Sequence, residues 1–357
     1  MLNVRISPHD HDSISTDKAM LYVVFALLPA AIWGCVMFGF RAAVVLVVSI
    51  ASSLLTEWLL GKINKENTLR DYSALVTGLL IGMNMPPSIP FLIPVLASVF
   101  AIFIVKWTFG GLGCNWANPA LAGRIFVFFS FSSLMSKFSL PWPLKSGAEL
   151  VSSATPLSAV KMEITSGLGS EAILSSANVP VSGIASSLSA SLGINPYFVD
   201  EFLGFAGGCI GEVSALLLIL GGLFLIYKKV ITWRIPVCYL ASYALLQWIF
   251  GGIRGGNGLF GGEVLLPLVS GGLMLGAFFM ATDWVTTPTT AKGEIIFALG
   301  CGFFTFIIRC FGSLAEGVSL AILLMNMVSP TIDRFCKAKK FGYVKPPKRR
   351  LSLPLQL

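Results

Sequence analysis

Long apolar stretches recur along this chain, separated by polar segments or by segments rich in glycine and proline. They cover residues 21–37, 42–60, 72–85, 91–105, 119–131, 202–227, 235–250, 264–281, 295–308 and 318–327. Crossing the hydrocarbon core of a bilayer, roughly 30 Å thick, takes about 20 helical residues. Several stretches are shorter than that, and their flanks contain glycine and proline. The pattern predicts an all-α integral membrane protein with about ten transmembrane helices, some of them broken.

The composition supports a membrane protein. Hydrophobic residues make up 55% of the 357 positions and charged residues only 12%, whereas soluble domains carry about 25% charged residues. The net charge of +8 does not indicate nucleic-acid binding, because many basic residues crowd the C-terminal tail. The first apolar stretch is not followed by a cleavage site, so it is expected to be a retained span.

The basic residues also predict an orientation. With the N-terminus inside, most of the 25 Lys and Arg residues fall in inside segments, as the positive-inside rule requires. Both termini are therefore expected in the cytoplasm. The predicted organisation is a first membrane repeat at 1–133, an extracytoplasmic loop at 134–200, a second membrane repeat at 201–333 and a basic cytoplasmic tail at 334–357. The tail is also a candidate for contact with anionic lipid.

A short internal match suggests that the two membrane segments are related. The sequence Leu-Val-Thr-Gly-Leu at 75–79 is similar to Leu-Val-Ser-Gly-Gly at 268–272. Five predicted spans separate the two copies, so they would cross the membrane in opposite senses. This is the pattern of two inverted five-helix repeats, with functional sites where broken helices meet. The alternative is that two glycine-containing apolar helices look alike by chance.

One segment between the fourth and fifth stretches combines glycines with two amides. It reads Gly-Gly-Leu-Gly-Cys-Asn-Trp-Ala-Asn-Pro from residue 110 to residue 119. Asn118 precedes a proline and is suited to cap a helix that begins there. Asn115 and Asn118 each offer a donor and an acceptor to a bound heterocycle. A re-entrant loop that uses these amides for its own stability is the alternative.

Two acidic residues stand next to apolar stretches. Glu212 lies within a glycine-rich segment near the start of the sixth stretch, and Asp283 follows the eighth. Ionisable groups at membrane depth are costly and indicate function by default, so both are candidates for an ion path. Solvation at the membrane surface is the alternative for each acid. Arg124 and Arg309 can snorkel or pair with such acids.

The 134–200 loop contains many hydroxyl groups, among them Thr155 in the segment Ser-Ser-Ala-Thr-Pro at 152–156. Residue type and spacing alone do not distinguish this threonine from its neighbours. The seven cysteines form no CxxC pair and most lie in apolar stretches. We therefore expect no metal site and no cysteine-ligated cluster in this chain.

These segments together resemble the family of RnfD subunits of Rnf ion-translocating oxidoreductases and the related NqrB subunits of sodium-pumping NADH:quinone reductases. The resemblance covers nearly the whole chain. Besides the glycine-rich block ending in Asn-Pro-Ala-Leu-Ala-Gly-Arg at 118–124, it includes Gly-Glu-Val-Ser at 211–214 and Phe-Met-Ala-Thr-Asp at 279–283.

The resemblance implies two flavins. In the family, FMN is joined through its phosphate to the threonine of a Ser-Gly-Ala-Thr-like motif, which matches Thr155 with Ser153 and Ala154 here; Ser153 replaces the usual glycine. It also implies a non-covalent riboflavin-type flavin nearer the cytoplasmic side, for which Asn115 and Asn118 are the candidate contacts. No catalytic side chain is expected, because the cofactors carry the chemistry.

The implied function is electron transfer between ferredoxin and NAD, coupled to Na⁺ or H⁺ movement across the bacterial inner membrane. The implied partners are the other subunits of the complex, including an FMN-bearing subunit and iron–sulfur subunits. An NqrB-type subunit is one alternative, which the short N-terminal segment disfavours. A solute channel or transporter with inverted repeats is another.

Overall fold

The computed structural model describes residues 15–65, 68–144, 152–153, 155–163, 169–256, 258–314 and 316–337. Helices dominate these residues, and one antiparallel pair of two-residue strands joins Phe138–Ser139 (β1) to Ser152–Ser153 (β2). The first group of helices comprises α1 (Thr16–Phe38), α2 (Phe40–Asn64), α3 (Ser73–Met83), α4 (Leu92–Val99), a π-helical continuation (Phe100–Trp107) and α5 (Pro119–Ser130).

A peripheral group follows, in which the helices are short. It comprises α6 (Ser132–Met135), α7 (Pro156–Glu163), α8 (Ser170–Ser176), α9 (Gly183–Leu192) and α10 (Pro196–Leu203). The last group comprises α11 (Ala215–Tyr227), α12 (Arg234–Phe250), α13 (Leu265–Val269), α14 (Leu273–Leu275), a π-helical turn (Gly276–Met280), α15 (Ala291–Cys310) and α16 (Val318–Phe335). The single-turn helices Leu69–Asp71 and Trp142–Leu144 complete the described elements.

Four of the described helices, α1, α2, α15 and α16, are both long and apolar enough to cross a membrane. Their outward surfaces are apolar as well: Phe25 and Ile32 on α1 are each 59% exposed, and Val47 on α2 is 63% exposed. Such surfaces are unfavourable in water and suited to lipid. The fold is therefore that of a predominantly helical membrane protein. Shorter apolar helices lie at the other expected positions, and the number of ten spans stays a prediction.

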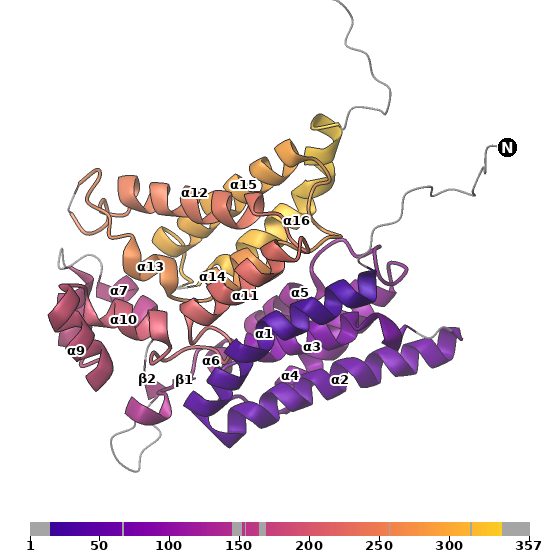
Figure 1. Cartoon of the computed structure of the whole chain (residues 1–357), viewed down its shortest axis with the longest axis horizontal. Coiled ribbons are helices and arrows are strands. Elements are labelled where there is room, and N and C mark those ends of the chain that lie inside the picture. The colour runs from indigo at the N-terminus through magenta and orange to yellow at the C-terminus, as the bar shows by residue number, and fades with distance from the viewer. Residues whose placement is uncertain are drawn as a thin grey trace, which may run out of the picture.

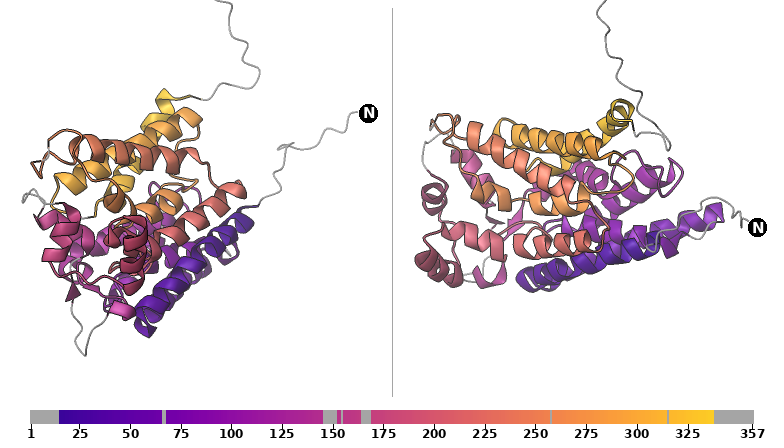
Figure 2. Two further views of the ribbon diagram at one scale, coloured as in Figure 1. Left: turned by 60° about the vertical axis from the view of Figure 1, so that its left-hand side comes forward. Right: turned by 45° about the horizontal axis from the view of Figure 1, so that its top comes forward.

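The first and last groups pack against each other along their length (Figure 1), with α1 against α11 and α5 against α16. In both views of Figure 2, α1 and α2 lie along one side of the molecule. Small residues permit the close approach. A Cβ on Gly221 of α11 would lie 2.4 Å from the Ala26 carbonyl oxygen of α1, so this position requires glycine.

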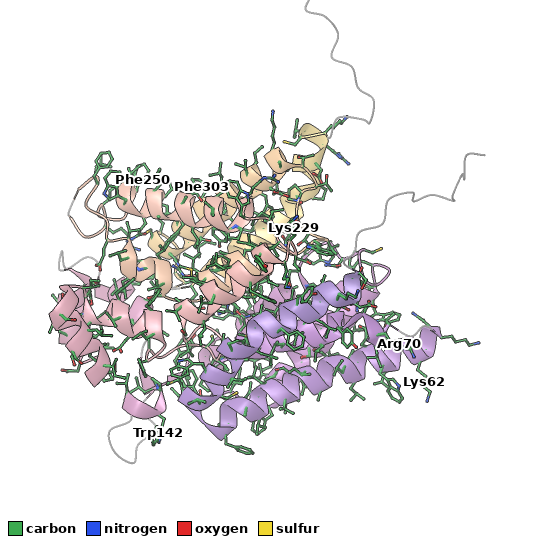
Figure 3. The ribbon with its side chains drawn as sticks, in the orientation of Figure 1. Lys62, Arg70, Trp142, Lys229, Phe250 and Phe303 are labelled. Carbon is green, nitrogen blue, oxygen red and sulfur yellow. The ribbon has the colours of Figure 1, made fainter. Side chains whose placement is uncertain are left out.

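The peripheral helices α7–α10 gather at one end of the molecule, away from the start of α1 and the end of α16 (Figure 1). Figure 3 shows Lys62 and Arg70 at the end where α2 finishes, and Trp142 at the end with the peripheral helices. The described part of the predicted 134–200 loop thus forms a helical cap on one end of the bundle.

Two of the expected helices are interrupted. The sixth apolar stretch does not form one helix, because residues 204–214 separate α10 from α11. This segment instead pairs with the end of α3 and the residues that follow it: Gly211 N donates to Met83 O at 2.7 Å and Ile210 N to Met85 O at 3.1 Å. The eighth stretch breaks between α13 and α14, where Gly271 and Gly272 both have φ of +62°.

The matched pentapeptides differ in conformation. Residues 75–79 lie inside α3, whereas residues 268–272 contain the break between α13 and α14. The short sequence match therefore does not correspond to one shared local structure, and the inverted repeat stays a prediction.

Candidate functional site

A cavity of about 350 Å³ lies between the first and last groups of helices. Its volume is within the range of small-molecule sites, roughly 300–1,000 Å³. Apolar side chains form most of its wall, with polar groups at a few points. The lining includes Ala19, Val23, Thr77, Leu80, Lys106, Asn115, Asn118, Val230, Ile231, Phe279, Thr282 and Asp283. Because the start of α1 contributes to this wall, the cavity is at the end of the bundle opposite the peripheral helices (Figure 1).

The structure brings the two predicted amides into this cavity and gives them different environments. Asn118 caps α5, because its Oδ1 accepts from Ala120 N at 3.0 Å and from Leu121 N at 3.5 Å. Its Nδ2 donates to the Met280 carbonyl oxygen at 3.2 Å and so joins the two groups of helices. Asn115 uses its Nδ2 in a local bond to Ala117 O at 2.9 Å. Both polar atoms of the Asn118 side chain are therefore bonded within the protein. The side chain of Asn115 bonds through its Nδ2, and its carbonyl oxygen remains available to a ligand.

Asp283 is the predicted acid that lines the same cavity. It follows the π-helical turn 276–280, and its Oδ2 accepts from Thr286 Oγ1 at 3.1 Å. Sequence motifs that lie more than 150 residues apart thus meet at one site, and the bond from Asn118 to Met280 O holds them together.

Sequence reasoning missed a buried ion pair, of which Lys106 lines the cavity. Lys106 Nζ lies 2.7 Å from Glu57 Oε1 and 2.7 Å from Ser73 Oγ. Glu57 also accepts from Thr68 Oγ1 at 2.6 Å and from Trp107 Nε1 at 3.1 Å, so both of its oxygens are bonded. Glu57 lies within one predicted apolar stretch, and Lys106 lies at the edge of another. An ionisable group in such a place is energetically costly, and this cost is the sequence signal that could have identified both residues.

A second polar cluster lies away from the cavity and contains Glu212. Arg124 of α5 reaches Glu316 Oε2 at 2.5 Å and Glu212 Oε1 at 3.3 Å. Its other Nη atom donates to Asn84 Oδ1 at 2.7 Å and to Ser319 Oγ at 2.9 Å. Of the two roles suggested for Arg124, snorkelling or pairing with an acid, the structure shows the second, with Glu212 as a partner. The two predicted ion-path acids do not meet, because Asp283 lines the large cavity and Glu212 belongs to this cluster.

Arg309 has a different role. Its guanidinium donates to the carbonyl oxygens of Pro267, Ser270 and Gly271 at 2.6–3.0 Å. These carbonyls end α13, where the chain breaks and the helix cannot bond them itself. Arg309 therefore caps a broken helix.

Thr155 lies directly before α7 and is 7% exposed. Its Oγ1 accepts from Ser158 N at 3.2 Å and donates to Ser158 Oγ at 3.0 Å, which is the arrangement of a helix N-cap. Ser153 pairs with Phe138 in the short sheet. Ala154 lies outside the described residues.

A small cavity of about 10 Å³ joins Thr155 to the acidic cluster, with Glu201, Glu212 and Glu316 in its wall. A space of this size holds about one water molecule. It has no room for a flavin, so a flavin joined to Thr155 would have to lie outside this cavity.

The large cavity, in contrast, fits a flavin ring system. Apolar side chains such as Leu80 and Phe279 can pack on the faces of a planar heterocycle, and the polar residues Asn115, Thr77 and Thr282 lie in the same wall. A few polar groups in an apolar wall are typical of cofactor sites.

Comparison with known proteins agrees with the motifs. The model of the NQR2, RnfD, RnfE family matches residues 3–342. The D-type subunit of a Na⁺-translocating ferredoxin:NAD⁺ oxidoreductase complex from Acetobacterium woodii is 42% identical, over 96% of both chains. Its counterpart in a proton-translocating ferredoxin:NAD⁺ oxidoreductase complex from Clostridium ljungdahlii is 41% identical, also over 96% of both. The corresponding subunit of an ion-translocating oxidoreductase complex from Stutzerimonas stutzeri is 38% identical, over 92% of both. This chain therefore belongs to the NQR2, RnfD, RnfE family.

Proposed function

We propose that this chain is the D-type membrane subunit of an ion-translocating ferredoxin:NAD⁺ oxidoreductase complex and carries electrons through two flavins. One is FMN joined through its phosphate to Thr155, and the other is a non-covalent flavin in the 350 Å³ cavity. The supporting relatives include two that are named for ferredoxin and NAD⁺, each similar over almost the whole chain. The chain would span the bacterial inner membrane with both termini in the cytoplasm, beside an FMN-bearing subunit and iron–sulfur subunits.

The observation that carries the proposal is the cavity itself. It brings Asn115, Asn118 and Asp283 together from separate motifs and encloses them with apolar side chains. Thr155 belongs to the opposite end of the bundle, with the peripheral helices (Figure 1). Two redox groups at opposite ends of a membrane subunit would provide a path for electrons across it. A flavin supplies electron-transfer chemistry when it is bound, while this chain binds it, orients it and excludes water.

The charges around the large cavity favour an uncharged flavin. The Lys106 ammonium is neutralised by Glu57 at 2.7 Å and faces Asp71 at 4.0 Å. Asp283 adds a further carboxylate to the wall. A phosphate would therefore meet no surplus of positive charge, so riboflavin suits the cavity better than FMN does.

The energy scale is compatible with ion transport. Moving one charge against 100 mV costs about 2.3 kcal/mol, which one electron supplies by falling through the same voltage.

Denaturing electrophoresis under ultraviolet light tests the covalent flavin. The chain, produced with its partner subunits and the flavin-attaching enzyme, is expected to give a fluorescent band that disappears in Thr155→Ala. Thr287→Ala is a matched control, since Thr287 also precedes a proline, and it should keep the band. Absence of fluorescence in the native chain would contradict the proposal of covalent FMN.

The non-covalent flavin is tested by extraction and chromatography, with riboflavin expected in the Thr155→Ala complex as well.

A further inference from the structure

Lys161 joins the peripheral helix α7 to the end of the long apolar helix α15. Its Nζ donates to the Ile308 carbonyl oxygen at 3.2 Å and also to the Leu314 carbonyl oxygen. Ile308 belongs to the last turn of α15, and Leu314 follows that helix in the chain. The last carbonyls of a helix have no partner within it and carry the negative end of its dipole. A basic side chain from another segment is therefore a suitable partner for this end of α15.

The same face of α7 lies against the break between α13 and α14. Leu157 and Lys161 are on one side of the helix, because residues i and i+4 are neighbours on a helix surface. A Cβ on Gly271 would lie 2.9 Å from Leu157 Cδ2 and 3.3 Å from Arg309 Nη2. Leu157 therefore packs beside the broken backbone that Arg309 caps. Together, Leu157 and Lys161 hold α7 at two points on the last group of helices.

Thr155 moves together with α7, because it is bonded to the first turn of that helix. Its Oγ1 accepts from Ser158 N at 3.2 Å, and its carbonyl oxygen accepts from Ala159 N at 3.0 Å. The helix itself has only 8 residues, and helices shorter than about 12 residues are marginal without tertiary contacts. The contacts that α7 makes with its neighbours therefore decide where Thr155 lies.

The surroundings of Lys161 are positively charged. Arg254 donates to the Cys310 carbonyl oxygen at the end of α15, and Arg309 lies in the last turn of the same helix. Among the described residues, no carboxylate forms an ion pair with Lys161. Burial, together with the Arg254 and Arg309 guanidiniums and against the opposing effect of Cys310, lowers the pKa of the Lys161 ammonium from 10.5 to about 8. A neutral amine still has two N–H donors, which match its two carbonyl acceptors.

We propose that Lys161 is a positioning residue that fixes α7 on the end of α15 and thereby sets the place of the flavin on Thr155. The inference deepens the proposed function and rests on it, because the covalent flavin is part of that proposal. Lys161 acts through the helix, by its bonds to the Ile308 and Leu314 carbonyl oxygens. Leu157 supplies the apolar contact on the same face.

The contact has a pH dependence of definite sign. Between about pH 8 and pH 10.5, Lys161 in the docked helix has released a proton that a solvent-exposed lysine keeps. The docking of α7 on α15 is therefore strengthened as the pH rises through this range. With a pKa of about 8 in the docked helix and 10.5 in the free one, the docking equilibrium constant increases about tenfold from about pH 7 to about pH 9.

Hydrogen–deuterium exchange of the intact purified complex measures the docking of α7. Protection of peptides covering 156–163 is compared at about pH 7 and about pH 9, after correction for the exchange rate of the unfolded chain, and the wild type is expected to gain about tenfold. Lys161→Arg should show no such gain, since a guanidinium keeps its charge at both pH values. Lys161→Met should lose about tenfold in protection at the higher pH, because both carbonyls then lack their donor. Lys137→Met is the control, since Lys137 is exposed in the segment between α6 and β1, and it should match the wild type.

Fluorescence anisotropy of the covalent flavin tests the positioning role apart from the stability of the helix. The Thr155→Ala complex provides the signal of the non-covalent flavin, which is subtracted. The anisotropy of the flavin at Thr155 is expected to fall in Lys161→Met, because the helix that carries it is less firmly held. Lys161→Arg keeps donors for the two carbonyls and should restore the anisotropy.

Several results would overturn the proposal. Equal protection of α7 at both pH values in the wild type would do so, and this comparison needs no variant that folds. The same gain in Lys161→Arg would assign the titration to another group. Lost protection in Lys161→Met with unchanged anisotropy would show that the contact does not position the flavin. A wild-type chain without a covalent band contradicts the proposed function itself, and the exchange profile of α7 distinguishes that failure from a failure of the contact at Lys161.

Discussion

Lys106 Nζ lies 2.7 Å from Glu57 Oε1, with the two side chains 3% and 0% exposed, inside the membrane part of the molecule. The pair joins the π-helical segment 100–107 to α2, and Lys106 forms part of the wall of the large cavity. Breaking a buried pair by removing one partner is strongly destabilising, because the other charge is left uncompensated. The pair therefore offers a direct test of the structure.

Lys106→Met is expected to destabilise the protein by about 3–5 kcal/mol, since Glu57 then keeps a buried charge without its cation. The double variant Lys106→Met/Glu57→Leu removes both charges and should recover most of this loss. The measurement is thermal unfolding of the detergent-solubilised complex for both single variants and the double variant. Additive losses in the double variant would contradict the pairing.

Asn118→Ala is expected to lower stability by about 1 kcal/mol for the lost N-cap of α5, with a further loss from the bond to the Met280 carbonyl oxygen. Asn118→Asp keeps the acceptor for Ala120 N but not the donor to Met280, so it should lie between the wild type and Asn118→Ala in melting temperature. An Asn118→Asp protein as unstable as Asn118→Ala would argue against the capping role.

Asn115→Leu separates ligand binding from stability. Asn115 lines the large cavity, and its side-chain carbonyl oxygen is proposed to bond the non-covalent flavin. Loss of one such bond weakens binding by about tenfold, since 1.4 kcal/mol corresponds to a factor of ten. We expect less extractable riboflavin after dilution, with the covalent band at Thr155 unchanged. Equal riboflavin retention in Asn115→Leu and wild type would exclude Asn115 as a contact.

Burial, together with the nearby Glu212 and Asp200 carboxylates, raises the pKa of the Glu201 carboxyl from 4.5 to about 8. Between these pH values the folded protein keeps a proton that the unfolded chain has released. The free energy of unfolding therefore falls as the pH rises from about 4.5 to 8. Glu201→Gln removes the titrating group and should flatten this dependence.

Melting temperatures of the complex in Na⁺-free buffer from about pH 5 to pH 8.5 check the Glu201 prediction, because this range covers the fall in stability. Glu294→Gln is the control and should keep the wild-type slope. The same slope in Glu201→Gln and wild type would show that another group is responsible.

Gly272→Ala is expected to be destabilising for two reasons. Its φ of +62° costs about 1–2 kcal/mol for a residue with a Cβ, and that Cβ would lie 2.5 Å from Glu212 Oε1. Gly183→Ala is a suitable control, because a Cβ there contacts nothing within 4 Å. The melting temperature should drop in the first variant and stay within about 1 °C in the second, because surface substitutions usually change stability by less than about 0.5 kcal/mol. Equal effects would contradict the backbone geometry at the break.

The sequence determined the class of protein and the positions of most helices. Long apolar stretches cannot be solvated as isolated segments in water, and only helices satisfy the backbone in lipid, so the bounds of helices such as α12 and α15 follow closely from hydropathy. The cap at Asn118 was also predictable, because an amide before a proline fits only the first turn of a helix.

The sequence could not predict where helices break or which distant groups meet. Residues 204–214 contain four glycines, which are compatible with a break, but no local pattern encodes the partner of this segment, which is the end of α3 and the residues that follow it. Asn115 and Asp283 were each suspected from the sequence, but only packing of the two groups of helices places them in one cavity. The same packing brings Glu201 and Glu316 to Glu212. Hydropathy depends on each residue alone, whereas a binding site depends on contacts between residues far apart in the chain, and those contacts are set by the tertiary fold.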